Sequence, residues 1–161
     1  MAELRVAGLV RRLLPVLEKS VAPEVDRVVR VRRPISILHG DFSIDNILLT
    51  SQAVFVVDFS SAVKNSIDFD IASFLNSLVS LRLTRFVPAS AIQRMSQRFL
   101  FGYFGAEQPP DVTTILLQCM GLADVALEVV SRRGSFIAHW WVEYVLGQAL
   151  QRLSGELARA R

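Results

Sequence analysis

HGDFSIDNILLTSQAVFVVDFS, residues 39–60, alternates polar segments with apolar runs. The runs Ile47–Leu49 and Ala53–Val57 are rich in β-branched and large apolar residues, which is typical of short strands. Thr50–Gln52 lies between them and predicts the turn of a β-hairpin. An antiparallel hairpin brings the end of its second strand back beside the start of its first. The two polar segments are therefore expected to lie side by side.

Oxygen-bearing side chains stand at both ends of this predicted hairpin. Asn46 precedes its first strand and Asp58 follows its second, so we expect them to converge. Carboxylate and amide oxygens are ligands that Mg²⁺ accepts, and Asp41 on the same loop is a candidate general base. Phosphoryl transfer requires little more, because the protein mainly positions the nucleophile and neutralises charge through a metal. Each residue also has a structural interpretation: Asp41 and Asp45 as turn formers, Asp58 as a strand-end cap.

Helical periodicity dominates the rest of the chain. Apolar residues recur at three- and four-residue spacing in five segments: 2–19, 69–83, 89–104, 111–133 (which Gly121 could interrupt) and 135–159. A polar loop is expected between Asp58 and Asp68. The fold class is therefore mainly α (α+β), a helical bundle with a small β-hairpin. We expect one domain over 1–161, divided into leading helices, a hairpin region and a helical bundle: 1–34, 35–60 and 61–161.

Composition excludes several classes of protein. A chain of 161 residues with 52% hydrophobic and 20% charged residues is not a disordered tail. One cysteine, Cys119, excludes a disulfide scaffold. No apolar run approaches the roughly 18–20 residues of a membrane span, and the charged N-terminus lacks the apolar core of a secretory signal. The sequence predicts a soluble, cytoplasmic protein.

Charge is unevenly distributed. The chain has a formal net charge of +3, but residues 41–70 carry five Asp and one Lys. Such a segment is a poor surface for a phosphate backbone and a good one for divalent cations. The basic segment Arg27–Arg33 leaves three alternatives open: a solvated face, contact with a nucleic acid, or contact with an anionic substrate. A basic nucleic-acid-binding helical domain therefore remains an alternative, with steeply salt-dependent affinity.

Three motifs in order give the sequence a family resemblance. HGDFSIDN (His39–Asn46) is followed by a strand, the pair Asp58-Phe59, and Asp70-Ile71-Ala72. This arrangement resembles the catalytic core of the aminoglycoside phosphotransferase and choline-kinase-like group, which has a protein-kinase-like fold. The resemblance is closest over residues 35–74. It implies a small-molecule kinase that uses ATP and Mg²⁺ and transfers a phosphoryl group to a substrate hydroxyl.

The resemblance also implies roles for individual residues. Asp41 would be the catalytic base, and Asn46 and Asp58 the magnesium ligands. His39 would tie the loop to the metal-binding segment, and the Asp70 carboxylate would accept backbone N–H groups of the loop at a helix N-terminus. Asp45 and Asp68 receive no role from the resemblance.

Two departures from the family pattern stand out. Asn65 and Ile67 occupy positions where the family often has Gly and Pro; Asn tolerates the left-handed backbone that Gly would supply. Before residue 35 there is no glycine-rich loop, and Lys19 is the only Lys. We therefore expect a C-terminal lobe only, with the nucleotide lobe absent. The chain is then part of a longer kinase, a partner of a separate lobe, or a non-catalytic kinase-like scaffold or regulatory module.

The acceptor substrate is not identified by the sequence. Asp124 and Glu128 stand four residues apart on one predicted helix and are candidate substrate-binding residues. Three acids, with Glu143, are few for a polycationic aminoglycoside. The expected partners are a nucleotide, a small hydroxyl-bearing acceptor and a separate lobe, but neither a membrane nor a nucleic acid.

Overall fold

The computed structural model describes residues 35–85, 87–105 and 112–131. It also describes ten further residues: Arg11, Pro15, Glu18, Tyr144, Gly147, Gln148, Ala149, Gln151, Arg152 and Gly155. The predicted helices 2–19 and 135–159 lie outside the continuous part of this description. None of the described helices is long and apolar enough to cross a membrane.

The chain divides into two compact units. Arg32–Pro110 form one unit, and Met1–Val31 with Asp111–Arg161 form the other. The described part is mostly helical with two small antiparallel sheets, as the mainly α prediction requires. The expected single domain over 1–161 stays a prediction.

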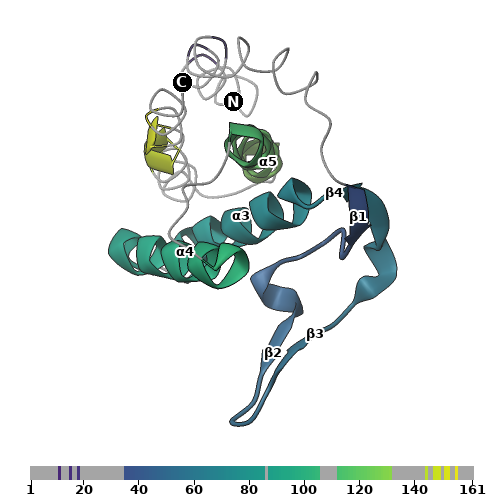
Figure 1. Ribbon diagram of the computed structural model, residues 1–161. Helices are drawn as coiled ribbons and strands as arrows, with labels where there is room; N and C mark the ends of the chain where they lie inside the picture. Colours follow the sequence, from purple (N-terminus) through teal and green to yellow (C-terminus); the bar gives the residue numbers. More distant parts are fainter. Residues whose placement is uncertain are drawn as a thin grey trace. The chain divides into compact units, whose positions relative to one another are not determined.

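Each of the two sheets has two strands. β2 (Ile47–Leu49) pairs with β3 (Val54–Val56), with Leu48 opposite Phe55. This pairing confirms the predicted hairpin, which extends away from α3 and α4 in Figure 1. β1 (Ile35–Leu38) pairs with β4 (Val63–Ser66) and leads directly into the HGD motif.

The segment between Asp58 and Asp68 is more regular than predicted. Instead of a polar loop, it contains the 3₁₀ turn η3 (Phe59–Ser61) and the strand β4. β4 has a single apolar residue, Val63, so its sequence does not favour a strand; it forms because β1 offers it a pairing edge. Asn65 consequently has strand geometry, and the expected left-handed turn there is wrong. Among the described residues other than glycine, only Asp58 has a positive φ, 63°.

The described helices agree with the predicted segments. α3 spans Asp68–Thr84, α4 spans Ala89–Phe104 and α5 spans Val112–Ser131. α4 ends at Gly105, whose φ of 69° and N–H bond to the Phe101 carbonyl form a left-handed helix cap. α5 continues through Gly121 without interruption.

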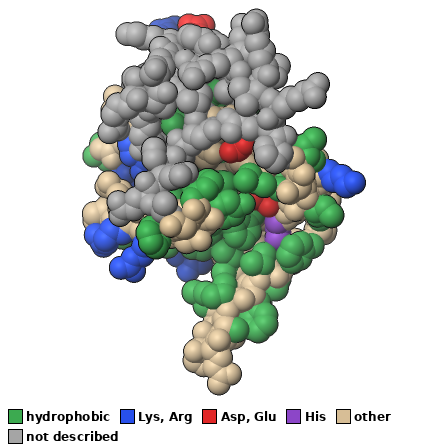
Figure 2. Space-filling view, viewed as in Figure 1, with side chains coloured by type: hydrophobic (Ala, Val, Ile, Leu, Met, Phe, Trp, Pro, Cys, Tyr) green, Lys and Arg blue, Asp and Glu red, His purple; other side chains and the backbone are tan. Residues whose placement is uncertain are grey.

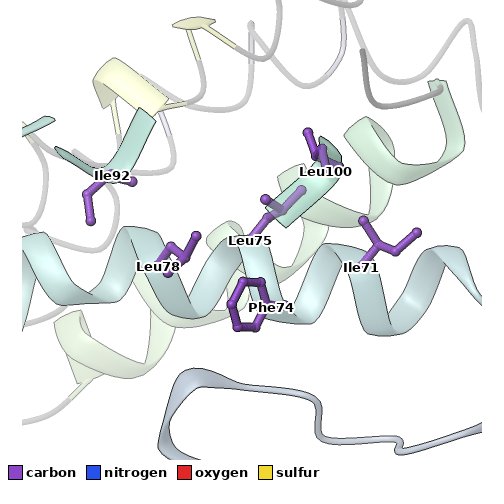
Figure 3. Close-up of a cluster of buried hydrophobic side chains, with 6 residues drawn as sticks. All are labelled: Ile71, Phe74, Leu75, Leu78, Ile92 and Leu100. Atoms are coloured by element: carbon purple, nitrogen blue, oxygen red, sulfur yellow. The ribbon is translucent and has the colours of Figure 1, made fainter. Parts of the chain in front are cut away.

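The core of the 32–110 unit lies between α3 and α4. Six buried side chains form it, all drawn in Figure 3: Ile71, Phe74, Leu75, Leu78, Ile92 and Leu100. In that view Ile71, Leu75 and Leu78 point from α3 toward α4. Phe74 leaves α3 on another side, where its ring lies 4.1 Å from that of Phe99 of α4, between centroids. Phe42 and Ile44, from the loop after β1, pack against this cluster. The core therefore extends from the helix pair to the loop that carries the HGD motif.

Candidate active site

The loop His39–Asn46, called the HGD loop below, is held by two side chains of α3. The Asp70 carboxylate accepts the backbone N–H of His39 at 2.8 Å and that of Gly40 at 3.0 Å. Ser77 accepts the N–H of Ile44 at 3.0 Å and donates its own proton to the Phe74 carbonyl. Asp70 and Ser77 are seven residues apart, so they lie two turns apart on one helix face. α3 thus holds both the beginning and the middle of the loop.

Aromatic packing anchors the same loop to the core. The ring of Phe42 lies 5.2 Å from that of Phe74 and 6.2 Å from that of Phe99, between centroids. Phe74 and Phe99 themselves are 4.1 Å apart. These contacts partly bury Phe42, the residue directly after Asp41, while the Asp41 side chain is exposed. The loop is therefore attached rigidly to the core and presents the Asp41 carboxylate to solvent.

His39 links the HGD loop to the end of the hairpin. Its Nε2 lies 2.8 Å from the Val57 carbonyl, which can only accept a hydrogen bond, so Nε2 carries the proton. Nδ1 then accepts the N–H of Asp41 at 3.4 Å. The ring is buried and lies 4.5 Å from that of Phe59. One imidazole therefore contacts the residue before Asp58, the residue after it, and Asp41.

Gly40 brings the loop against the η3 turn. Its φ is +82°, and a Cβ at this position would overlap the Ser61 carbonyl. Only glycine fits both the conformation and the space.

Asp41 and Asn46 contact each other within the loop. Nδ2 of Asn46 donates to the Asp41 backbone carbonyl at 2.9 Å and to Asp41 Oδ2 at 3.2 Å. The backbone carbonyl can only accept a hydrogen bond, so the amide has one orientation and its Oδ1 is turned away from Asp41. Within the described part of the chain, Oδ1 of Asp41 accepts no hydrogen bond. Each side chain thus keeps one oxygen available.

The hairpin brings Asp58 to the same place. The Val57 N–H donates to the Asn46 carbonyl at 3.0 Å, which extends the β2–β3 ladder by one step. Asp58 follows immediately, and its side chain is exposed. Ser60 donates its hydroxyl to Asp58 Oδ1 at 2.6 Å and its backbone N–H to the same oxygen at 3.4 Å. These hydrogen bonds lower the pKa of Asp58, and His39 adds a smaller lowering.

This donor set fits a divalent cation of the magnesium type. Mg²⁺ in nucleotide sites takes one or two protein oxygens and completes its coordination with phosphates and water. The Asp58 carboxylate and the Asn46 amide oxygen are oxygen donors of the kind that such an ion takes. No group of three or more His, Cys, Asp or Glu residues that could hold a metal occurs among the described residues.

The structure does not describe the side chains of the predicted substrate-binding residues. Asp124 and Glu128 lie on α5, in the other unit, and the described side chains of that helix end at Leu122. Glu143 lies outside the described residues. The substrate-binding role of Asp124 and Glu128 stays a prediction.

Sequence reasoning missed Ser77, Ser60 and the ring contact of Phe59 with His39. Ser77 has a detectable signal, its spacing of seven residues from Asp70 on a predicted helix. Ser60 has none, because its bond depends on the left-handed backbone of Asp58.

Comparison with known proteins supports the interpretation of the motifs. The searches of curated proteins and of solved structures found no match. The sequence model of the phosphotransferase enzyme family (APH) matches residues 2–105, which begins well before the HGD loop and covers more than half of the chain. This match confirms the resemblance indicated by the motifs. The chain therefore belongs to the phosphotransferase enzyme family.

Proposed function

We propose that this protein is an ATP-dependent phosphotransferase that transfers the γ-phosphoryl group to a hydroxyl of a small molecule. The acceptor oxygen forms the new P–O bond while the bond from the γ-phosphorus to the β–γ bridging oxygen breaks, leaving ADP. Asp41 orients the acceptor hydroxyl and takes its proton. Its Oδ2 is engaged by Asn46, so Oδ1 is the oxygen that faces the acceptor.

One observation carries the proposal. The Val57-to-Asn46 hydrogen bond sets Asp58 beside the residue whose amide already contacts Asp41. A candidate base and two candidate metal ligands thereby share one small region, although Asp58 is 17 residues away from Asp41 in the sequence. Family membership adds that phosphotransferase chemistry is the activity to expect of these residues.

Asn46 Oδ1 and Asp58 are the groups that would hold Mg²⁺. When bound, the ion neutralises charge on the nucleotide phosphates and so favours their approach to the acceptor. His39 and Asp70 keep the HGD loop in position through the hydrogen bonds given above. Asp124 and Glu128 remain candidates for binding the acceptor.

We further propose that residues 1–161 act as a kinase-like C-terminal lobe in the cytoplasm. The sequence before residue 35 has no glycine-rich loop to cover phosphates, so a nucleotide lobe would come from additional chain or from a partner. The exposed apolar hairpin supports this proposal: Leu49 is 75% and Val54 65% exposed. Figure 2 shows the projecting hairpin as green and tan surface.

Calorimetric titration of the protein with ATP, with and without Mg²⁺, tests the proposal. We expect nucleotide binding that requires Mg²⁺ and is lost in Asp58→Ala, with the melting temperature little changed because this side chain is exposed. Asp45→Ala is the matched control, since that exposed carboxylate has no assigned role.

Two results would argue against it. Normal magnesium-dependent binding in Asp58→Ala would refute the metal-ligand assignment. Absence of nucleotide binding even when a nucleotide lobe is supplied would favour a non-catalytic kinase-like scaffold instead.

A further inference from the structure

Asp58 is held differently from the other residues of the candidate site. Asp70 is partly buried, and Asn46 is held by two bonds to Asp41. Asp58 is exposed and follows the exposed hairpin, so packing does not fix its side chain. In the described part of the chain, its carboxylate accepts hydrogen bonds from Ser60 alone, both at Oδ1.

The hydroxyl bond is the stronger of the two. At 2.6 Å it has the length of a hydrogen bond to a charged carboxylate, whereas the backbone N–H lies at 3.4 Å, near the limit for such a bond. Because both donors meet Oδ1, no described residue donates a hydrogen bond to the second oxygen, Oδ2. A rotation of the Asp58 side chain would break the short bond, so the hydroxyl opposes that rotation.

We propose that Ser60 is a positioning residue, whose hydroxyl fixes the Asp58 carboxylate so that Oδ2 is presented to a divalent cation. This inference rests on the proposed function, because it takes Asp58 to be a metal ligand. Partners that hold a ligating side chain in orientation typically change metal affinity 10- to 100-fold when they are removed. Ser60 acts through Asp58 and touches neither the cation nor the nucleotide.

Three variants of the full chain separate this role from a general structural one. Ser60→Ala removes the hydroxyl, Ser60→Thr keeps it, and Ser61→Ala makes the same deletion at the next residue. Ser61 is exposed, and its hydroxyl makes no hydrogen bond to the residues that the structure describes. Comparison with Asp58→Ala gives the effect of losing the ligand itself.

The measurement is Mn²⁺ binding followed by electron paramagnetic resonance, made on the wild type and on all four variants. We expect about a tenfold weaker affinity in Ser60→Ala and recovery in Ser60→Thr.

The possible results separate the two proposals. Unchanged Mn²⁺ affinity in Ser60→Ala, or the same loss of affinity in Ser60→Thr and Ser61→Ala as in Ser60→Ala, would overturn the positioning role. If Mn²⁺ affinity is unchanged in Ser60→Ala but is lost in Asp58→Ala, the proposed function stands and only the role of Ser60 fails. If Asp58→Ala also binds Mn²⁺ normally, both proposals fail.

Discussion

The HGD loop and the β2–β3 hairpin carry the two halves of the candidate site, yet they are held in contrasting ways. The loop rests on α3 through Asp70, Ser77 and the ring of Phe42. The hairpin has apolar side chains on both faces, and most of them are exposed. An isolated two-stranded hairpin is marginally stable at best in water. The candidate base is thus carried by the core, whereas Asp58 depends on a weaker support.

The bonds between the two halves explain how Asp58 can still be positioned. His39 reaches across to the Val57 carbonyl, Val57 donates to Asn46, and Gly40 lies against Ser61. Each of these three contacts involves a residue of the HGD loop. The HGD loop therefore positions the residues next to Asp58. The rest of the β2–β3 hairpin takes no part in these three contacts.

The largest expected difference in stability is between a substitution in the core and the same substitution near the hairpin tip. Leu78 is 0% exposed and Leu49 is 75% exposed, so the same leucine-to-alanine change tests both regions. Leu78→Ala should lower the free energy of unfolding by about 2–5 kcal/mol. Leu49→Ala should change it by no more than about 0.5 kcal/mol. Urea unfolding measures both, and equal losses would contradict the contrast between the two regions.

Gly40→Ala tests the close contact between the HGD loop and η3. The positive φ alone should cost about 1–3 kcal/mol, and overlap with the Ser61 carbonyl adds to it. Gly102→Ala is the matched control: it lies inside α4 with open space around it, so alanine should stabilise the protein by about 0.5–1 kcal/mol. Opposite signs in urea unfolding are therefore expected. Stabilisation by both variants would show that the contact is absent.

Asp70→Ala tests the attachment of the loop to α3. Two backbone N–H groups lose their acceptor, so the free energy of unfolding should fall by about 1–3 kcal/mol. Asp70→Asn keeps one acceptor oxygen and should lie between Asp70→Ala and the wild type. Ser77→Ala, which removes one acceptor, should cost about 1 kcal/mol. An unchanged melting temperature in Asp70→Ala would exclude the role described for this residue.

The smallest effect concerns Tyr103 at the end of α4. Partial burial raises the pKa of Tyr103 above its ordinary value of 10.0, and the charges of Asp70 and Asp68 raise it further. The unfolded chain therefore loses this proton first as the pH rises. The contribution of Tyr103 to stability is complete below pH 10 and declines above it. Melting temperatures between pH 9 and 11 should fall less steeply in Tyr103→Phe; identical slopes would exclude this linkage.

The elements predicted well from the sequence are those with a local signal. α4 has regular apolar spacing and ends at a glycine, and the β2–β3 hairpin has two apolar runs around a polar turn. β4 was missed because its pairing partner, β1, lies far away in the sequence. The short hydrogen bond between Ser60 and Asp58 depends on the left-handed backbone of Asp58. The sequence does not predict this conformation, because Asp58 is not a glycine. Motifs therefore predict which residues belong to the candidate site, but they do not predict the hydrogen bonds that hold these residues in place.

Localised line broadening by Mn²⁺ in the NMR spectrum of the whole chain tests the central claim most directly. If Asn46 and Asp58 together hold a divalent cation beside Asp41, the amide signals of Asp41, Asn46 and Asp58 should broaden first, with the hairpin tip at Ser51 little affected. Asp58→Ala should remove this pattern. Broadening centred elsewhere, or the same pattern in Asp58→Ala, would contradict the account.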